Sequence, residues 1–226
     1  MLPISIINPV MHTVLYPIYS ELQFRPKERE KAYLLSMKFL SAIVVPLSLY
    51  AFVYSHEFIS VFLGEKWILY QDLFKVLIFV ALSKTLSNPG GALFLSIGRS
   101  DIGFWWNIFW ALTSWPVLII ALQINPSVMS VAYSWLFISY TIGILWYMIL
   151  ARIVGINYFG YIIFLFKLIT VSLLIIYAIL YSLSFIEIKN DGLTLLYTLS
   201  LFISLFIFYI VKFEKDIFGY FSKRFM

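Results

Sequence analysis

The chain has 226 residues, of which 62% are hydrophobic and only 12% are charged. A soluble domain is about 25% charged, and the mean hydropathy of +0.95 lies above the globular range. These values exclude a soluble enzyme, a nucleic-acid-binding module and a disordered segment. The net charge of +5 is assigned to loops at a membrane surface and not to a nucleic-acid partner. The composition predicts a polytopic membrane protein.

Catalytic and metal-binding motifs are missing from the sequence. It contains no cysteine, so disulfides, thiolate metal sites and cysteine nucleophiles are excluded. There is no Walker A loop, zincin helix or nucleophile elbow. We therefore expect no enzymatic activity, no cofactor and no metal, and no ATP-driven transport by this chain alone.

Long apolar runs predict transmembrane helices, because a span needs about 20 residues and a β-barrel would show short alternating segments. The stretch 102–151 contains fifty consecutive residues without a charged side chain, enough for two spans joined at Asn125 and Pro126. The predicted fold is an all-α membrane bundle of about seven spans. Their expected positions are residues 2–20, 39–54, 68–97, 102–122, 127–151, 159–185 and 193–211.

The regions between the spans predict the topology. Residues 21–38 are expected to be a cytoplasmic connector in which Pro26 starts a helix, and residues 212–226 a cytoplasmic tail. If the spans alternate, one face carries only Lys66 and Lys189. The positive-inside rule then predicts an external N-terminus and a cytoplasmic C-terminus. The basic residues of the cytoplasmic face are Arg25, Lys27, Arg29, Lys31, Lys38, Arg99, Arg152, Lys212, Lys215, Lys223 and Arg224.

The first residues of this sequence lack the features expected of a chain with an external N-terminus. Residues 1–20 contain no Lys or Arg and do not form a signal peptide. We therefore expect the chain to be the C-terminal part of a larger transporter, preceded by an odd number of spans.

Lys84 is the strongest candidate for a functional residue inside a span. A lysine at mid-bilayer costs roughly 2.5–3.5 kcal/mol, so its presence favours a functional role. Asn88 lies four residues later, on the same helical face. Pro89, Gly90 and Gly91 are expected to break the helix, as at the binding regions of secondary transporters. The alternative is that Lys84 snorkels to an interface and that Pro89 merely kinks the helix.

Other charged residues have simpler explanations. Lys75 is expected to pair with Asp72, Arg99 lies with Asp101 at a cytoplasmic turn, and Lys167 is placed to snorkel. The charge-free run is expected to be scaffold. The candidate substrate-binding residues are Lys84, Asn88, Arg99 and Lys167.

Three motifs in order resemble a known family. They are NPVMHTVLYPIYSELQ (residues 8–23), FLGEKW (residues 62–67) and SNPGGALFLSIGRSD (residues 87–101). This series resembles the polysaccharide and lipopolysaccharide exporters of the multidrug/oligosaccharidyl-lipid/polysaccharide superfamily, in the branch of colanic-acid and teichuronic-acid exporters. Members have about fourteen helices in two lobes, and the chain resembles the second lobe.

The resemblance implies a function and a set of partners. Such exporters flip an undecaprenyl-pyrophosphate-linked saccharide across the bacterial inner membrane by alternating access, so the implied partners are the lipid bilayer, this lipid-linked saccharide and a missing N-terminal lobe. Two other interpretations stay open. One is a membrane enzyme of polysaccharide assembly, a polymerase or an acyltransferase, for which His56 and Glu57 are the only suitable pair. The other is a non-functional truncated transporter.

Overall fold

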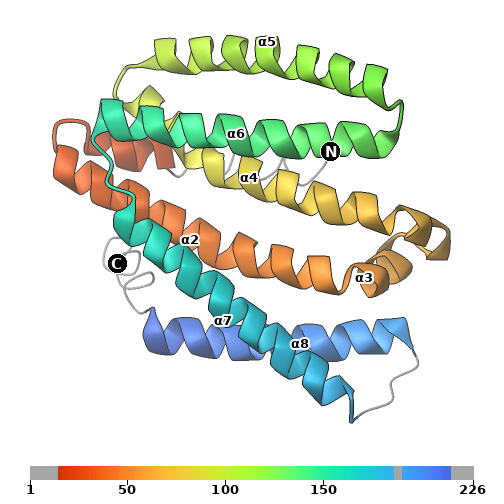
Figure 1. The fold of residues 1–226 in the computed structure, drawn as a ribbon. Coiled ribbons are helices and arrows are strands. Elements are labelled where there is room, and N and C mark those ends of the chain that lie inside the picture. Colours follow the sequence, from red (N-terminus) through yellow and green to blue (C-terminus); the bar gives the residue numbers. More distant parts are fainter. Residues whose placement is uncertain (1–14, 186–189, 215–226) are drawn as a thin grey trace. The chain divides into compact units, whose positions relative to one another are not determined.

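The structure is a computed structural model that describes residues 15–185 and 190–214. The described residues form helices and turns and include no strand (Figure 1), which confirms the all-α prediction. Most of the first expected span, residues 2–14, lies outside the described residues; residues 15–21 are helical.

Within residues 15–185 and 190–214, six long helices follow, with two short ones between the first and the second of them. Among the described residues, α2, α5, α6, α7 and α8 are long and apolar enough to cross a membrane; α4 is not one of these five. The long helices are α2 (Pro26–Val53), α4 (Gln71–Ser96), α5 (Ser100–Ile124), α6 (Val128–Val154), α7 (Phe159–Leu183) and α8 (Asp191–Phe213). The short ones are α3 (Ser55–Phe62) and the 3-10 helix η1 (Glu65–Tyr70).

Local sequence signals account for several helix ends. Helix α2 begins at Pro26, where the fixed φ of proline and its missing N–H suit a first turn. Ser127 caps α6 by accepting a hydrogen bond from the Ser130 backbone N–H at 3.1 Å. Gly155 ends α6 at φ 77°, a left-handed conformation that glycine adopts without steric cost.

Helix α4 differs from the expectation of a break at Pro89, Gly90 and Gly91, because it continues without interruption to Ser96. A single proline removes one intrahelical hydrogen bond, and packing holds the segment in place. Pro89 and Gly90 are both buried in this helix. A Cβ atom added to Gly90 would lie 2.6 Å from Trp146 Nε1 of α6, so the glycine permits close contact between the two helices.

The chain divides into two compact units. The first contains Met1–Leu40 and Val76–Ile162, and the second contains Ser41–Lys75 and Ile163–Met226. Helices α2, α4 and α7 contribute to both units.

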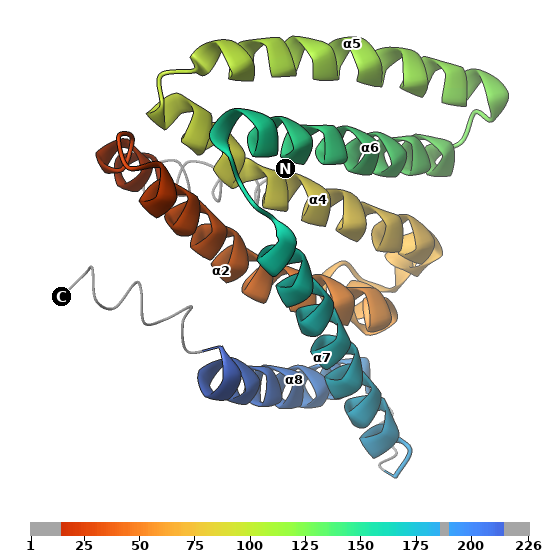
Figure 2. The same cartoon turned by 60° about the vertical axis from the view of Figure 1, so that its left-hand side comes forward.

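In the first unit, α4, α5 and α6 lie side by side, with α6 next to both of the others (Figures 1 and 2). Leu93 and Phe94 of α4 and Ile138 and Leu150 of α6 are all at most 2% exposed, and the Phe94 ring packs edge-on against Trp146 of α6 with the ring centroids 5.2 Å apart. The Ser83 hydroxyl of α4 donates to the Ser139 carbonyl of α6 at 3.1 Å, a further link between these two helices.

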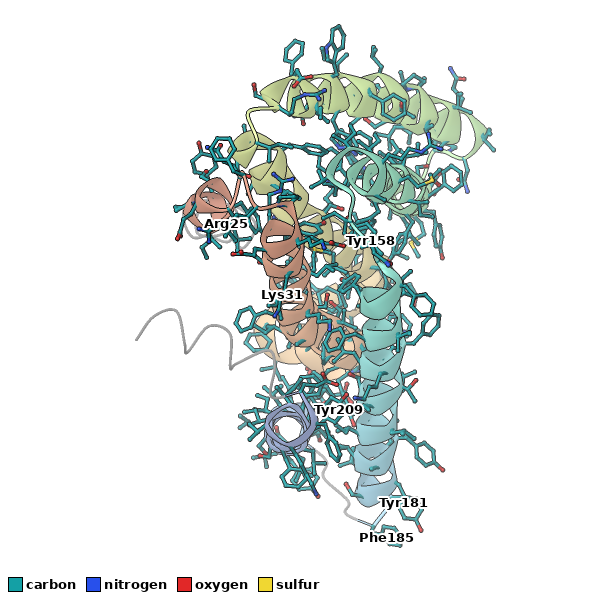
Figure 3. All side chains as sticks on the ribbon, turned by 90° about the vertical axis from the view of Figure 1, so that its left-hand side faces the viewer. Arg25, Lys31, Tyr158, Tyr181, Phe185 and Tyr209 are labelled. Atoms are coloured by element: carbon teal, nitrogen blue, oxygen red, sulfur yellow. The ribbon has the colours of Figure 1, made fainter. Side chains whose placement is uncertain are left out.

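The start of α2 belongs to the same unit and contacts the turn after α6. The Asn157 backbone N–H donates to Glu30 Oε1 at 2.8 Å, and the Tyr158 hydroxyl donates to the Tyr33 hydroxyl at 3.3 Å. Burial raises the pKa of Tyr158 to about 12, so this phenol stays neutral. Arg25 and Lys31 project from the segment around the start of α2 (Figure 3), at the end of the unit that also carries the α6 C-terminus.

The second unit has its own aromatic core, formed by α7, α8 and the last part of α2. The Tyr50 hydroxyl lies 2.8 Å from Thr198 Oγ1, which gives α2 and α8 a buried polar contact. On α3, His56 Nδ1 lies 3.9 Å from Asp191 Oδ2 at the start of α8. The core side chains are Tyr50, Tyr54, Ile176, Ile179, Leu195 and Phe202.

Candidate functional site

A cavity of about 630 Å³ lies in the first unit, lined by α4, α5 and α6. This volume is in the usual range for small-molecule sites. The cavity contains both Lys84 and Asn88, because residues four apart share one helical face. Lys84 and Leu95 are eleven residues apart, so the cavity extends about 16 Å along α4. We refer to it as the Lys84 cavity.

Two tryptophans hold the ammonium group of Lys84. Its Nζ atom lies 4.2 Å from the centroid of the Trp135 ring and 5.3 Å from that of Trp110. The two rings pack with their centroids 5.1 Å apart. Cation–π attraction of this kind contributes about 0.5–2 kcal/mol, more where water is excluded. Within the described part of the chain, Lys84 forms no ion pair with a carboxylate, so its positive charge is not neutralised.

Amides and hydroxyls line the rest of the cavity between aromatic rings. Ser87 and Ser100 also line the cavity. The Asn107 side-chain NH2 group donates to the Gly103 carbonyl at 2.8 Å, and the Asn107 side-chain oxygen remains available as an acceptor. The Trp106 and Trp146 rings pack 4.6 Å apart between centroids. A cation, amides and indole faces together suit a ligand that carries both an anionic group and hydroxylated rings.

Arg99 does not line the Lys84 cavity. It lies at the start of α5 and lines a second space of about 740 Å³, the α5–α6 groove, together with Arg152. Arg99 Nε lies 2.9 Å from Asp101 Oδ1, and this hydrogen bond and charge raise the pKa of the exposed guanidinium above its ordinary value.

Lys167 belongs to the second unit, whereas Lys84 belongs to the first. The Lys167 Nζ atom lies 2.7 Å from Glu214 Oε1, which also accepts a hydrogen bond from the Tyr209 hydroxyl at 3.2 Å. This ion pair gives Lys167 a structural partner.

Sequence reasoning missed most of the cavity wall. Trp106, Asn107, Trp110 and Trp146 come from the charge-free run, which was expected to be scaffold only. Tryptophan spacing gives no signal for this arrangement, because the rings meet Lys84 only after α4, α5 and α6 pack together.

Comparisons with known proteins support the resemblance over part of the chain. Residues 1–72 match a family model described as polysaccharide biosynthesis protein. The teichuronic acid biosynthesis protein TuaB of Bacillus subtilis (strain 168) is 28% identical over 160 residues, which is 71% of this chain and 33% of that protein. The lipopolysaccharide biosynthesis protein WzxC of Escherichia coli (strain K12) is 28% identical over 160 residues, 69% of this chain and 32% of that protein.

The matched region is therefore about a third of the length of these curated relatives. No solved structure gives a significant match. The relatives and the apolar helices identify a multi-pass membrane protein with homology to bacterial polysaccharide biosynthesis proteins.

Proposed function

We propose that the chain is part of a transporter that flips lipid-linked saccharide units across the bacterial inner membrane. The single observation that carries the proposal is the Lys84 cavity, where an unneutralised cation, amides and indole rings lie within one membrane-embedded space. The similarity to polysaccharide biosynthesis proteins supports the substrate class. In this proposal Lys84 binds the diphosphate, and Asn88 and Asn107 bind sugar hydroxyls.

The position of Lys84 fits this role. It lies twelve residues before the end of α4 at Ser96, which is about 18 Å along the helix. We infer that α4 crosses the bilayer beside α5 and α6, although its own composition does not mark it as a span. The depth of Lys84 is then near the middle of a hydrocarbon core of about 30 Å, where alternating-access transporters place their substrate.

The proposed orientation follows from the distribution of charge. Arg99 and Arg152 lie at the same end of the first unit, and Arg25 and Lys31 lie near the start of α2. Positive charge favours the cytoplasmic side. The Lys84 cavity then extends from Ser100 near the cytoplasm toward the membrane centre, which suits capture of a substrate made inside the cell.

We infer that the complete transport unit contains more helices than this chain supplies. The relatives are about three times as long as the region they share with it. Two lobes that enclose one cavity are the basis of alternating access, so we infer a further lobe opposite the Lys84 cavity. It belongs to the same polypeptide or to a second one.

Export of surface polysaccharide in cells tests the proposal. The gene, in its native context, is expressed in a strain without its own flippase, and surface polymer and lipid-linked intermediates are measured at equal protein levels. We expect Lys84→Gln to lower export at least tenfold and lipid-linked units to accumulate. Lys84→Arg keeps the charge and should retain part of the export.

The control is Lys75→Gln, which changes the same residue type on the same helix. Lys75 pairs with Asp72 at 3.6 Å and does not line the Lys84 cavity, so export should match that of the wild type. Unchanged export with Lys84→Gln would remove Lys84 from the site. A change in polymer length or acylation without accumulation of lipid-linked units would favour the membrane-enzyme interpretation instead.

A further inference from the structure

The α5–α6 groove has a polar end and an apolar body. Arg99, Asp101 and Arg152 lie at one end, and apolar side chains line the rest of its walls. Several of these are well exposed, among them Trp105 at 65% and Met148 at 46%. Lipid acyl chains can pack into a large exposed apolar groove of a membrane protein. The cations at the end of this groove favour a lipid with a negatively charged headgroup.

Arg152 supplies the free positive charge of this end. It is the basic residue of the last turn of α6 and is exposed. The negative end of the helix dipole stabilises a cation at this position. No carboxylate among the described residues forms an ion pair with Arg152. Asp101 neutralises much of Arg99 at 2.9 Å. The two arginines and the one aspartate leave a net charge of +1, which complements one phosphate.

The length of the groove matches one leaflet of a bilayer. It extends along α5 from Arg99 to Phe109, which is ten residues and about 15 Å. Half of a hydrocarbon core of about 30 Å has the same thickness. If the headgroup of a phospholipid contacts Arg152, one of its acyl chains can therefore lie along Trp105 and Phe109, because the groove and one leaflet have about the same length.

We propose that the α5–α6 groove binds an anionic phospholipid of the surrounding leaflet, with its phosphate on Arg152 and Arg99 and an acyl chain along α5. The site is distinct from the Lys84 cavity, although Trp106 lines both. It requires membrane residence and does not depend on the proposed transport function. A tightly held lipid would fill the groove and bring α5 and α6 together at this end.

Tryptophan quenching by brominated lipids tests this site directly. The full chain is reconstituted in phosphatidylcholine bilayers, and either phosphatidylglycerol or phosphatidylcholine with acyl chains brominated near their middle is added in steps. We expect brominated phosphatidylglycerol to reach half of its maximal quenching at a lower mole fraction than brominated phosphatidylcholine. Inorganic phosphate in the buffer should not relieve this quenching, because it lacks the acyl chain.

Variants separate the groove from general surface charge. Arg152→Gln should raise the half-maximal mole fraction of phosphatidylglycerol about five-fold, and Arg152→Lys should raise it less. Lys31→Gln removes an exposed charge of the first unit outside the groove and should leave it unchanged. Trp105→Phe removes a tryptophan that reports from the groove and should reduce the additional quenching by brominated phosphatidylglycerol. This variant keeps the test decisive if circular dichroism shows that Arg152→Gln does not fold.

Three results would overturn the proposal. One is equal quenching of the wild type by the two lipids. Another is an equal effect of Arg152→Gln and Lys31→Gln, which would indicate unspecific attraction to the surface. The third is relief of quenching by inorganic phosphate, which would indicate a simple anion site.

Discussion

The Lys84 Nζ atom lies 4.2 Å from the centroid of the Trp135 ring, so a lysine of α4 is held by an aromatic side chain of α6. This contact lowers the cost of a cation within the helices without neutralising its charge. The lysine thus remains available to an anionic ligand, which would have to compete with two indole rings for it.

A double-mutant cycle measures this contact. Lys84→Met, Trp135→Leu and the double variant are compared by thermal or denaturant unfolding in detergent micelles. We expect a coupling energy of about 0.5–2 kcal/mol. We also expect Lys84→Met to match or exceed the stability of the wild type, because it removes the desolvation cost of the ammonium group. Additive effects of the two substitutions would contradict the contact.

Gly90 is expected to be essential for the packing of α4 on α6. A Cβ atom there would lie 2.6 Å from Trp146 Nε1 and 2.9 Å from Leu150 Cδ1. Gly90→Ala should therefore destabilise the protein by about 1–3 kcal/mol. Gly103→Ala is the control, since no atom lies within 4 Å of its added Cβ, and it should stabilise α5 by about 0.5–1 kcal/mol. Equal melting temperatures of the two variants would show that α4 and α6 do not approach this closely.

Two neighbouring tyrosines of the second unit should respond differently to loss of their hydroxyls. The Tyr50 hydroxyl contacts Thr198 Oγ1 at 2.8 Å, so Tyr50→Phe should cost about 0.5–1.5 kcal/mol. The buried Tyr54 hydroxyl has no hydrogen-bond partner among the described residues. Tyr54→Phe should accordingly be neutral or stabilising. Unfolding of both variants in the same detergent decides the point, and a larger loss for Tyr54→Phe would be inconsistent with the structure.

The proposed orientation can be tested by labelling, because the chain contains no cysteine. A single cysteine at Lys31 should react with a membrane-impermeant maleimide only after the cells are opened. One at Asn125, in the α5–α6 turn, should react in intact cells. The opposite labelling pattern would show that the topology is the reverse of the proposed one, with the Lys84 cavity extending inward from the outer face.

Much of the helical framework could be predicted from sequence, because lipid leaves few alternatives to helices. The charge-free run predicted two spans, and α5 and α6 lie there with a turn at Asn125 and Pro126. Pro26 marked the start of α2. The helix–helix contacts gave no such signal. Pro89 was expected to break α4, yet burial of Gly90 against α6 keeps the helix continuous.

The cavity itself was only partly predictable. The four-residue spacing of Lys84 and Asn88 predicts that they share one helical face, and both line the same space. Trp110 and Trp135 approach Lys84 from two other helices, so nothing in the local sequence indicates them. Arg99 was grouped with Lys84 by charge alone, although it lies in a different space.

The most direct test of the central claim is the affinity of the bilayer-embedded protein, with its complete transport unit, for an undecaprenyl-pyrophosphate-linked saccharide. Intrinsic tryptophan fluorescence reports binding, because Trp106, Trp110 and Trp146 line the Lys84 cavity. We predict saturable binding that Lys84→Gln weakens at least tenfold and that Lys75→Gln leaves unchanged. Equal affinity of the wild type and Lys84→Gln would contradict the assignment of the Lys84 cavity as the substrate site.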